Sequence, residues 1–265
     1  MSHHVNVERL EFEFGNILIA ELNRPAQKNP LDVDTVGELL GIVATAIADP
    51  RTRGLVITGA GDAFSAGGDL KKYVSLYQNP ADFRRFQQSI YRLCELLESG
   101  ELITFAMVNG ACVAGGLEVA LACDFIVMAE GARIGDGHLK FGQLPGAGGS
   151  QRLCRAIGLQ KAKEVLLTGK LYGAREALEM QLISRAVPLD TLREETLRLC
   201  QEVCRHSPLA LKEMKNLVTL SQNHLREEAL RREEDAVHVY ATESEDAFEG
   251  LQSFIEKRAP RYLGS

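Results

Sequence analysis

The chain has 265 residues, 45% of them hydrophobic and 25% charged, which is an ordinary balance for a soluble globular protein. Its formal net charge of −6 argues against a nucleic-acid partner, although backbone amides and a few Lys or Arg could still bind an anionic small molecule. The sequence has no run of about 18 apolar residues and no export signal at its start, so we expect a cytoplasmic protein without a membrane partner.

The N-terminal half alternates strands with helices. Residues 7–24 alternate apolar and polar side chains on both sides of Gly15-Asn16, which predicts a β-hairpin. Helical periodicity covers 32–50, 81–99 and 115–123, and short apolar runs that predict buried strands cover 54–61, 103–110 and 124–130. This alternation favours parallel βαβ units with right-handed crossovers, hence an α/β fold.

The C-terminal half is mostly helical. Helices are predicted over 149–170, 173–182, 189–207, 208–222 and 225–242, with only 182–188 extended between them. We therefore expect an α/β core over residues 1–200, followed by a helical segment over 201–265.

The six cysteines predict reduced thiols and not a metal site. None forms a C-x-x-C pair, and most lie in apolar stretches. Cys200, Cys204 and His206 are close in sequence, but no second cluster completes a tetrahedral set of ligands, so no metal is expected.

Three glycine-containing stretches carry the candidate chemistry: "TGAGDAFSAGGDL" (58–70), "NGACVAGGLEV" (109–119) and "GDGHLKFGQLPGAGG" (135–149). None matches the dinucleotide or phosphate-loop glycine patterns, and the nucleophile elbow of serine hydrolases is missing. Glycine lets a backbone amide approach a ligand closely, so two amides from separate turns can together form an oxyanion hole.

The segments "FSAGGDL", "NGACVAGGLEVALACD", "PGAGGSQRL" and "FIEKRAPRY" together resemble the crotonase (enoyl-CoA hydratase/isomerase) family. The resemblance extends from "LNRP" at 22–25 to residue 262. It implies a β-β-α spiral core with a C-terminal helical part that makes trimer contacts, commonly in two stacked trimers. The implied substrate is an acyl-CoA, with coenzyme A entering as part of the substrate and no separate cofactor.

The resemblance also implies the site residues. The oxyanion amides match Gly68 and Gly115, and Glu118 matches the first of the two glutamates that hydratases of the family use. The second glutamate lies seven residues before the proline of "PGAGG", and counting back from Pro145 gives His138. Positions assigned to CoA binding are Lys28, Ala66, Gly67, Gly68, Asp69, Leu70, Gly115, Phe254 and Lys257, the last two sometimes reaching a neighbouring subunit in the family.

Several roles stay open from the sequence alone. A buried Glu118 would have a raised pKa suited to proton exchange, and His138 either delivers water or protonates the enolate carbon. Asp69 is expected to cap a helix, and Tyr73 either faces solvent or enters the acyl pocket. Hydration of a 2-enoyl-CoA is the first hypothesis, and the breakdown of fatty acids, amino acids or aromatic acids would fit it equally. The alternatives are isomerisation, decarboxylation or C–C cleavage of a CoA thioester, and a non-catalytic CoA-binding protein.

Overall fold

The computed structural model describes residues 3–265, apart from the side chains of residues 222 and 223. Its central element is a six-stranded sheet with the order β1-β2-β3-β5-β7-β10. The strands are β1 (Val5–Phe12), β2 (Gly15–Leu22), β3 (Thr52–Gly59), β5 (Ile103–Val108), β7 (Phe125–Ala129) and β10 (Arg185–Val187). The hairpin β1–β2 is antiparallel, and every other neighbouring pair is parallel. This confirms the predicted hairpin and parallel βαβ units.

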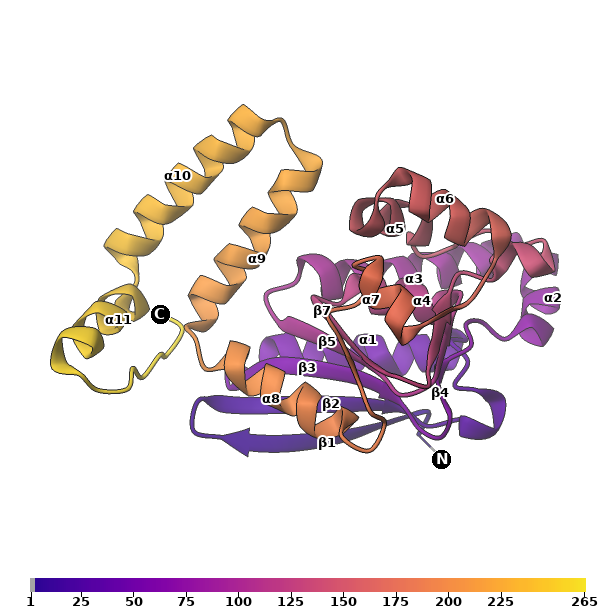
Figure 1. Cartoon of the computed structure of the whole chain (residues 1–265), viewed down its shortest axis with the longest axis horizontal. Helices are drawn as coiled ribbons and strands as arrows, with labels where there is room; N and C mark the ends of the chain where they lie inside the picture. Colours follow the sequence, from indigo (N-terminus) through magenta and orange to yellow (C-terminus); the bar gives the residue numbers. More distant parts are fainter. Residues whose placement is uncertain (1–2) are drawn as a thin grey trace.

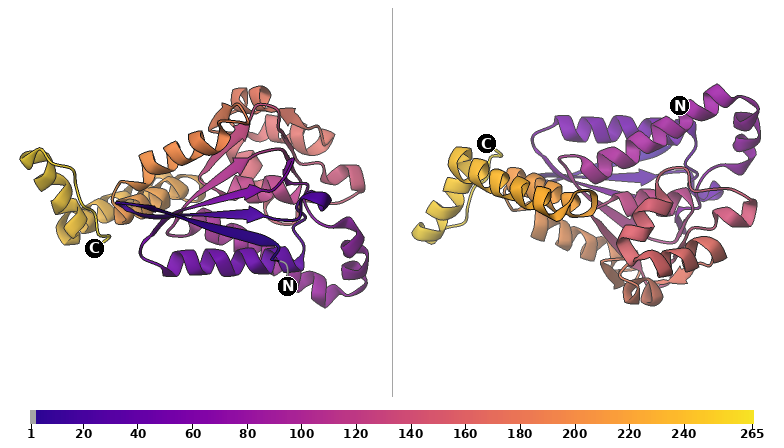
Figure 2. Two further views of the ribbon diagram at one scale, coloured as in Figure 1. Left: turned by 90° about the horizontal axis from the view of Figure 1, so that it is seen from below. Right: turned by 90° about the horizontal axis from the view of Figure 1, so that it is seen from above.

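Helices cover both faces of this sheet (Figure 1). Helices α1 (Val33–Ala48) and α3 (Pro80–Ser99) pack together on one face, and α8 (Leu192–Cys204) packs against β3, β5 and β7 on the other. The two faces separate clearly when the sheet is seen from below (Figure 2). Asp32 caps the N-terminus of α1: its carboxylate accepts a hydrogen bond from the Thr35 amide and so satisfies one free N–H of the first turn.

A second, smaller sheet has the order β4-β6-β8-β9 and was not predicted from the sequence. Its strands β4 (Ala63–Ser65), β6 (Ala111–Val113), β8 (Arg133–Gly135) and β9 (Tyr172–Gly173) have at most three residues. Such strands are too short for a period-two pattern to be recognised. The first three lie directly before or within the glycine-containing stretches, so this sheet brings those stretches together.

Short helices complete the core: η1 (Pro25–Gln27), α2 (Leu70–Gln78), α4 (Gly115–Ala122), η2 (His138–Phe141), α5 (Gly149–Ile157), α6 (Leu159–Thr168) and α7 (Ala174–Glu179). The single helix predicted over 149–170 is therefore wrong. Gly158 adopts a φ of 76° between α5 and α6, a conformation that glycine reaches without strain, and the chain turns there.

Three helices, α9 (Pro208–Asn223), α10 (Arg226–Glu243) and α11 (Glu245–Glu256), extend away from the sheets at one end of the molecule (Figures 1 and 2). Lys215 ties α9 to the core, because its buried ammonium donates to the carbonyls of Leu97 and Leu102 and to Asp124. The α/β core followed by helices is thus confirmed. The boundary proposed at residue 200 stays a prediction, and α8 runs through it. Across residues 3–265, no helix combines the length and the apolar character that crossing a bilayer requires.

Candidate active site

Two glycine turns meet just beyond the carboxyl ends of β4 and β6 in the small sheet. Strand β4 leads into Gly67 and Gly68, and the parallel strand β6 leads into Gly115, the first residue of α4. The turns touch, because a Cβ built on Gly67 would lie 2.9 Å from the Ala114 Cβ and 3.1 Å from the Gly115 nitrogen. The structure therefore brings Gly67, Gly68 and Gly115 together, as the sequence predicted.

Each of the two turns has a backbone N–H group that is free to donate a hydrogen bond to a ligand. Gly115 begins a helix, so its N–H is one of those without an acceptor inside the helix. Within residues 3–265, the Gly68 amide donates to no protein acceptor. Ala114 holds a φ of 52°, a conformation that costs a non-glycine residue about 1–3 kcal/mol. Two amides without protein acceptors, on turns that touch each other, are the kind of donors from which an oxyanion hole is built.

Glu118 lies in the first turn of α4 and is only 2% exposed. Its Oε1 accepts hydrogen bonds from the amides of Ala147 (2.7 Å), in the loop before α5, and of Gly149 (2.9 Å), the first residue of α5. Burial raises the pKa of the Glu118 carboxyl, while the Gly149 and Ala147 amides and the charge of His138 act in the opposite direction. A buried carboxyl with a raised pKa can exchange protons near neutral pH.

His138 begins η2, and its side chain is 14% exposed. Its Nδ1 lies 2.8 Å from Asp136 Oδ1, and its Nε2 lies 3.8 Å from Glu118 Oε2. Burial lowers the pKa of His138, but the hydrogen bond and charge of Asp136, with the charge of Glu118, outweigh it and leave the pKa raised. The structure thus brings His138 and Glu118 face to face, and Asp136 orients the ring.

Tyr73 on α2 is an additional residue at this site. Its hydroxyl lies against Gly68, where a Cβ would collide with it. Burial, and then the negative charge of Glu118, raise the pKa of Tyr73 to about 12. The sequence left this side chain undecided, because one face of a short helix cannot be assigned before its neighbours are known.

Most of the residues predicted to bind CoA lie close together, around the η1 turn, the end of β4 and the start of α2. The Ala66 amide donates to the Lys28 carbonyl at 2.9 Å, which joins the η1 turn to the end of β4. Asp69 caps α2 by accepting from the amides of Lys71 and Lys72, as expected, and Leu70 is the first helical residue.

Phe254 and Lys257 lie apart from this group. Both belong to the end of α11, at the opposite end of the molecule from α2 and β4 (Figure 1). Phe254 is 83% exposed. Within one chain, the structure does not bring these two residues to the site.

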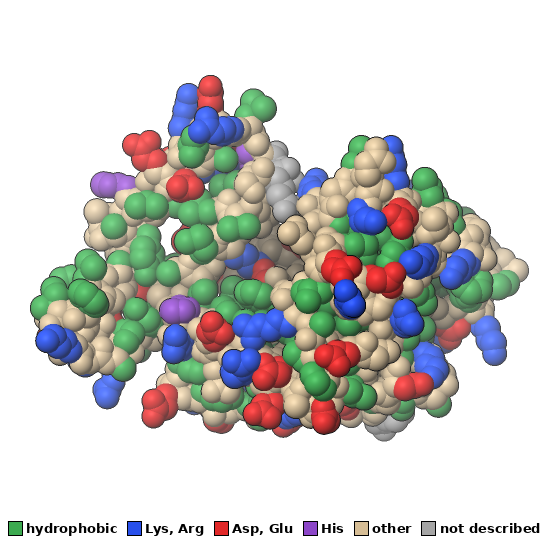
Figure 3. Space-filling view, in the orientation of Figure 1, with side chains coloured by type: hydrophobic (Ala, Val, Ile, Leu, Met, Phe, Trp, Pro, Cys, Tyr) green, Lys and Arg blue, Asp and Glu red, His purple; other side chains and the backbone are tan. Residues whose placement is uncertain are grey.

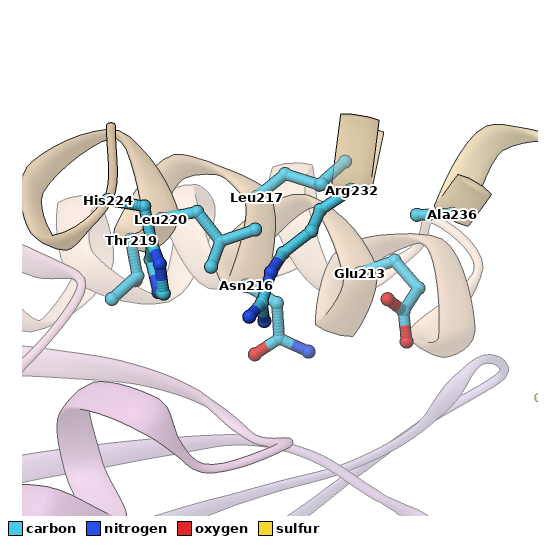
Figure 4. Close-up of a pocket in the computed structure, with 8 residues that line it drawn as sticks. All are labelled: Glu213, Asn216, Leu217, Thr219, Leu220, His224, Arg232 and Ala236. Carbon is cyan, nitrogen blue, oxygen red and sulfur yellow. The ribbon is translucent and has the colours of Figure 1, made fainter. Parts of the chain in front are cut away.

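The cavities of the molecule include several along the C-terminal helices. One of about 450 Å³ lies between α9 and α10, where Arg232 extends from α10 toward Asn216 on α9 (Figure 4). It carries neither Glu118 nor His138. In the described part of the chain, no group of three or more His, Cys, Asp or Glu side chains is placed to hold a metal ion.

Comparisons with known proteins agree with this geometry. The family model "Enoyl-CoA hydratase/isomerase" matches residues 13–265. The chain is 34% identical over 250 residues to the 2,3-dehydroadipyl-CoA hydratase of Escherichia coli, covering 94% of this chain and 95% of the relative. It is 33% identical over 256 residues to an enoyl-CoA isomerase/hydratase of Mycosarcoma maydis, covering 92% and 91%.

The fold comparison gives the same result. The crystal structure of an enoyl-CoA hydratase from Bacillus anthracis superposes with a TM-score of 0.91 at 33% identity, covering 99% of this chain and all of the other. The crotonase resemblance inferred from the glycine motifs is therefore confirmed, and the chain belongs to the enoyl-CoA hydratase/isomerase family.

Proposed function

We propose that this protein hydrates a 2-enoyl-CoA to a 3-hydroxyacyl-CoA. The observation that carries the proposal is the buried Glu118 carboxylate, whose Oε1 is bound by two loop amides while Oε2 faces His138 beside the Gly67–Gly68 and Gly115 turns. The E. coli relative is named as a hydratase of an unsaturated CoA thioester, which supports the same reaction class.

The amides of Gly68 and Gly115 would hold the thioester oxygen while it gains negative charge. Removing one such donor costs about 3–4 kcal/mol of transition-state stabilisation in other enzymes. Because these amides carry the developing charge, we expect the reaction to need no metal and no redox cofactor. Lys28, Ala66 and the segment Gly67–Leu70 would bind coenzyme A as part of the substrate.

Glu118 and His138 would divide the proton transfers. Glu118 Oε2 removes a proton from water as the water oxygen bonds to the β-carbon, and the π electrons of the double bond move to form the enolate. Protonated His138 then gives a proton to the α-carbon, which restores the thioester carbonyl. Transfer of the proton on Glu118 back to His138 resets the site, and a small movement would close the 3.8 Å between Oε2 and Nε2 to hydrogen-bond distance.

Isomerisation of the double bond is the second candidate. Its supporting observation is that the second acid is a histidine held by Asp136, and one base that moves a proton between two carbons is enough for isomerisation. The Mycosarcoma maydis relative is named as an isomerase/hydratase. Both reactions share the enolate, so product analysis separates them.

We also propose self-association through the C-terminal helices, as a trimer or two stacked trimers. Large apolar side chains are exposed there, including Val218, Val237, Leu251, Phe254 and Ile255. Hydrophobic side chains are visible over this end of the molecule in Figure 3. A neighbouring copy would bury them and could supply Phe254 and Lys257 to the CoA site. The six free cysteines, five of them buried, support a reducing compartment such as the cytoplasm.

The test of the reaction is the ultraviolet absorbance of the conjugated thioester after crotonyl-CoA meets the purified protein. We expect the absorbance to decay with wild type, and the rate to fall by about 10²–10⁴-fold in Glu118→Gln and in His138→Ala. CoA binding should survive in both variants. A constant absorbance with wild type, while CoA still binds, would contradict hydration of this substrate, and unchanged turnover in Glu118→Gln would contradict the role of Glu118.

A further inference from the structure

The loop that binds Glu118 is itself held on its other side by an ion pair between the buried Arg152 and the half-buried Glu98. Arg152 on α5 is 7% exposed, and its Nη1 donates to the Ala147 carbonyl at 2.6 Å. Its Nε and Nη2 donate to Glu98 Oε2 on α3, at 3.0 and 2.7 Å. One guanidinium therefore links α3, α5 and the loop whose amides bind the proposed catalytic carboxylate.

The two glycines of this loop permit the close approach. Gly148 has a φ of 93°, and a Cβ there would collide with Arg152 Nη1. A Cβ on Gly149 would lie 2.8 Å from Glu118 Cγ. The segment Ala147–Gly149 thus lies in van der Waals contact with Arg152 on one side and Glu118 on the other, so a displacement of the guanidinium moves the loop against the carboxylate.

As a consequence, the two carboxylate oxygens of Glu118 have different partners. Oε1 is engaged by the amides of Ala147 and Gly149, whereas Oε2 faces Nε2 of His138. Fixing Oε1 sets the rotation of the carboxylate and directs Oε2 toward the reacting end of the site. Positioning of this kind matters, because a displacement of about 1 Å can cost on the order of 10²-fold in rate.

We propose that Arg152, held by Glu98, is a positioning residue that orients Glu118 through the Ala147–Gly149 loop and leaves Oε2 as the proton-transferring oxygen. The inference rests on the proposed catalytic role of Glu118. It assigns a function to the "PGAGGSQRL" segment beyond its use as a family marker.

Other charged or titratable groups also face Glu118. His138 Nε2 lies 3.8 Å from Glu118 Oε2, and Cys94 Sγ on α3 lies 3.9 Å from the Glu118 carbonyl oxygen. The charge of Asp136 also acts on Glu118, and the charge of Glu118 acts on Tyr73. The loop amides oppose the effect of burial on the Glu118 carboxyl, so loosening them should raise its pKa. None of the other groups is held by Arg152 through a direct hydrogen bond within the described residues.

The experiment compares Arg152→Met, Arg152→Lys and Glu98→Gln with wild type, in the full-length protein. Three quantities are measured: kcat and KM for crotonyl-CoA across pH, the pKa of the Glu118 carboxyl by carbon-13 NMR with Glu118→Gln used for assignment, and the melting temperature. Lys215→Met is the matched control. Lys215 is also a buried cation that holds two carbonyls and a carboxylate, but it anchors α9.

We expect Arg152→Met to lower kcat by on the order of 10²-fold with a smaller change in KM, and to raise the Glu118 pKa. Arg152→Lys keeps the positive charge and can still donate a hydrogen bond. Its kcat and its Glu118 pKa should therefore lie between those of Arg152→Met and wild type. Lys215→Met should lower the melting temperature without moving the Glu118 pKa. If Arg152→Met does not fold, Glu98→Gln carries the test, because it keeps the shape of the pair and removes one charge.

A folded Arg152→Met with wild-type kcat and wild-type Glu118 pKa would overturn the proposal. So would equal shifts of the Glu118 pKa in Arg152→Met and Lys215→Met, because the effect would then be a general loss of stability. If wild type does not turn over crotonyl-CoA, the hydratase proposal fails for that substrate, whereas the NMR titration still decides whether Arg152 controls the carboxylate.

Discussion

Nε2 of His138 lies 3.8 Å from Oε2 of Glu118, and the opposite nitrogen of the same ring is bound to Asp136. The ring therefore connects two carboxylates, one that orients it and one that it faces. The charge of Glu118 favours protonated His138, and the charge of His138 favours ionised Glu118.

Asp136→Asn should lower the pKa of His138, because the hydrogen bond and charge of Asp136 are the strongest influences that raise it against burial. The protonated fraction of His138 at neutral pH then falls, and with it the rate of any step in which His138 gives a proton. The measurement is an NMR titration of the imidazole alongside the pH profile of kcat. A His138 pKa that stays at its wild-type value would contradict this account.

The same raised pKa predicts a pH-dependent contribution to stability. Protonated His138 is favoured in the folded state, so its contribution is fully present below the ordinary pKa of about 6.5 and is lost as the pH rises through the folded-state value. Denaturant unfolding of wild type and His138→Gln should therefore differ more at pH 5 than at pH 9. If the difference in unfolding free energy between wild type and His138→Gln grew with pH, the pKa of His138 would be lowered in the folded state, contrary to this prediction.

Glu118→Gln should be more stable than wild type at neutral pH, although we expect it to turn over substrate more slowly. Burial raises the pKa of this carboxyl, so the folded state disfavours its ionised form. The cost appears as the pH rises through the unfolded-state pKa of about 4.3, and it is complete above the folded-state value. Thermal unfolding at pH 8 and pH 4 tests this, and the gain should be larger at pH 8. The prediction would be contradicted if Glu118→Gln and wild type had the same melting temperature at pH 8 as well as at pH 4.

The site positions could be predicted from sequence where they depend on order and spacing. Gly68, Gly115, Glu118 and His138 lie at fixed offsets within recognisable motifs, and the structure gathers all four. The partners around them could not be predicted. Arg152 is separated from Glu98 by 54 residues, and nothing in a linear pattern states which carboxylate a buried arginine will contact.

The same limit applies to the fold. Long periodic segments such as 81–99 were predicted correctly, since many residues share one signal. The strands of the small sheet have two or three residues each, and pairing between distant segments, not local propensity, forms them.

Gly67→Ala should separate the two glycine turns. Gly67 has a φ of 93°, which costs an alanine about 1–3 kcal/mol, and the added Cβ would press on Ala114 and the Gly115 nitrogen. We expect a lower melting temperature and a fall in kcat of at least about 10²-fold, as for the loss of one oxyanion donor. Gly41→Ala on α1 is the control, because nothing lies within 4 Å of its Cβ and alanine favours a helix. Gly67→Ala with wild-type kcat would contradict an oxyanion role for these turns.

Tyr73→Ala should change which acyl chains the enzyme accepts. The phenol lies over Gly68 and packs edge-on against Phe86 with ring centroids 5.8 Å apart, so its removal opens space beside the proposed thioester site. We expect the ratio of kcat/KM for a ten-carbon enoyl-CoA over crotonyl-CoA to rise by roughly 10-fold or more, since each methylene that finds a pocket contributes about 1–3 kcal/mol. Tyr73→Phe keeps the ring and should leave the ratio near its wild-type value. Equal ratios in wild type and Tyr73→Ala would place the acyl chain elsewhere, whereas a change in Tyr73→Phe alone would show that the hydroxyl, and not the volume of the ring, selects the substrate.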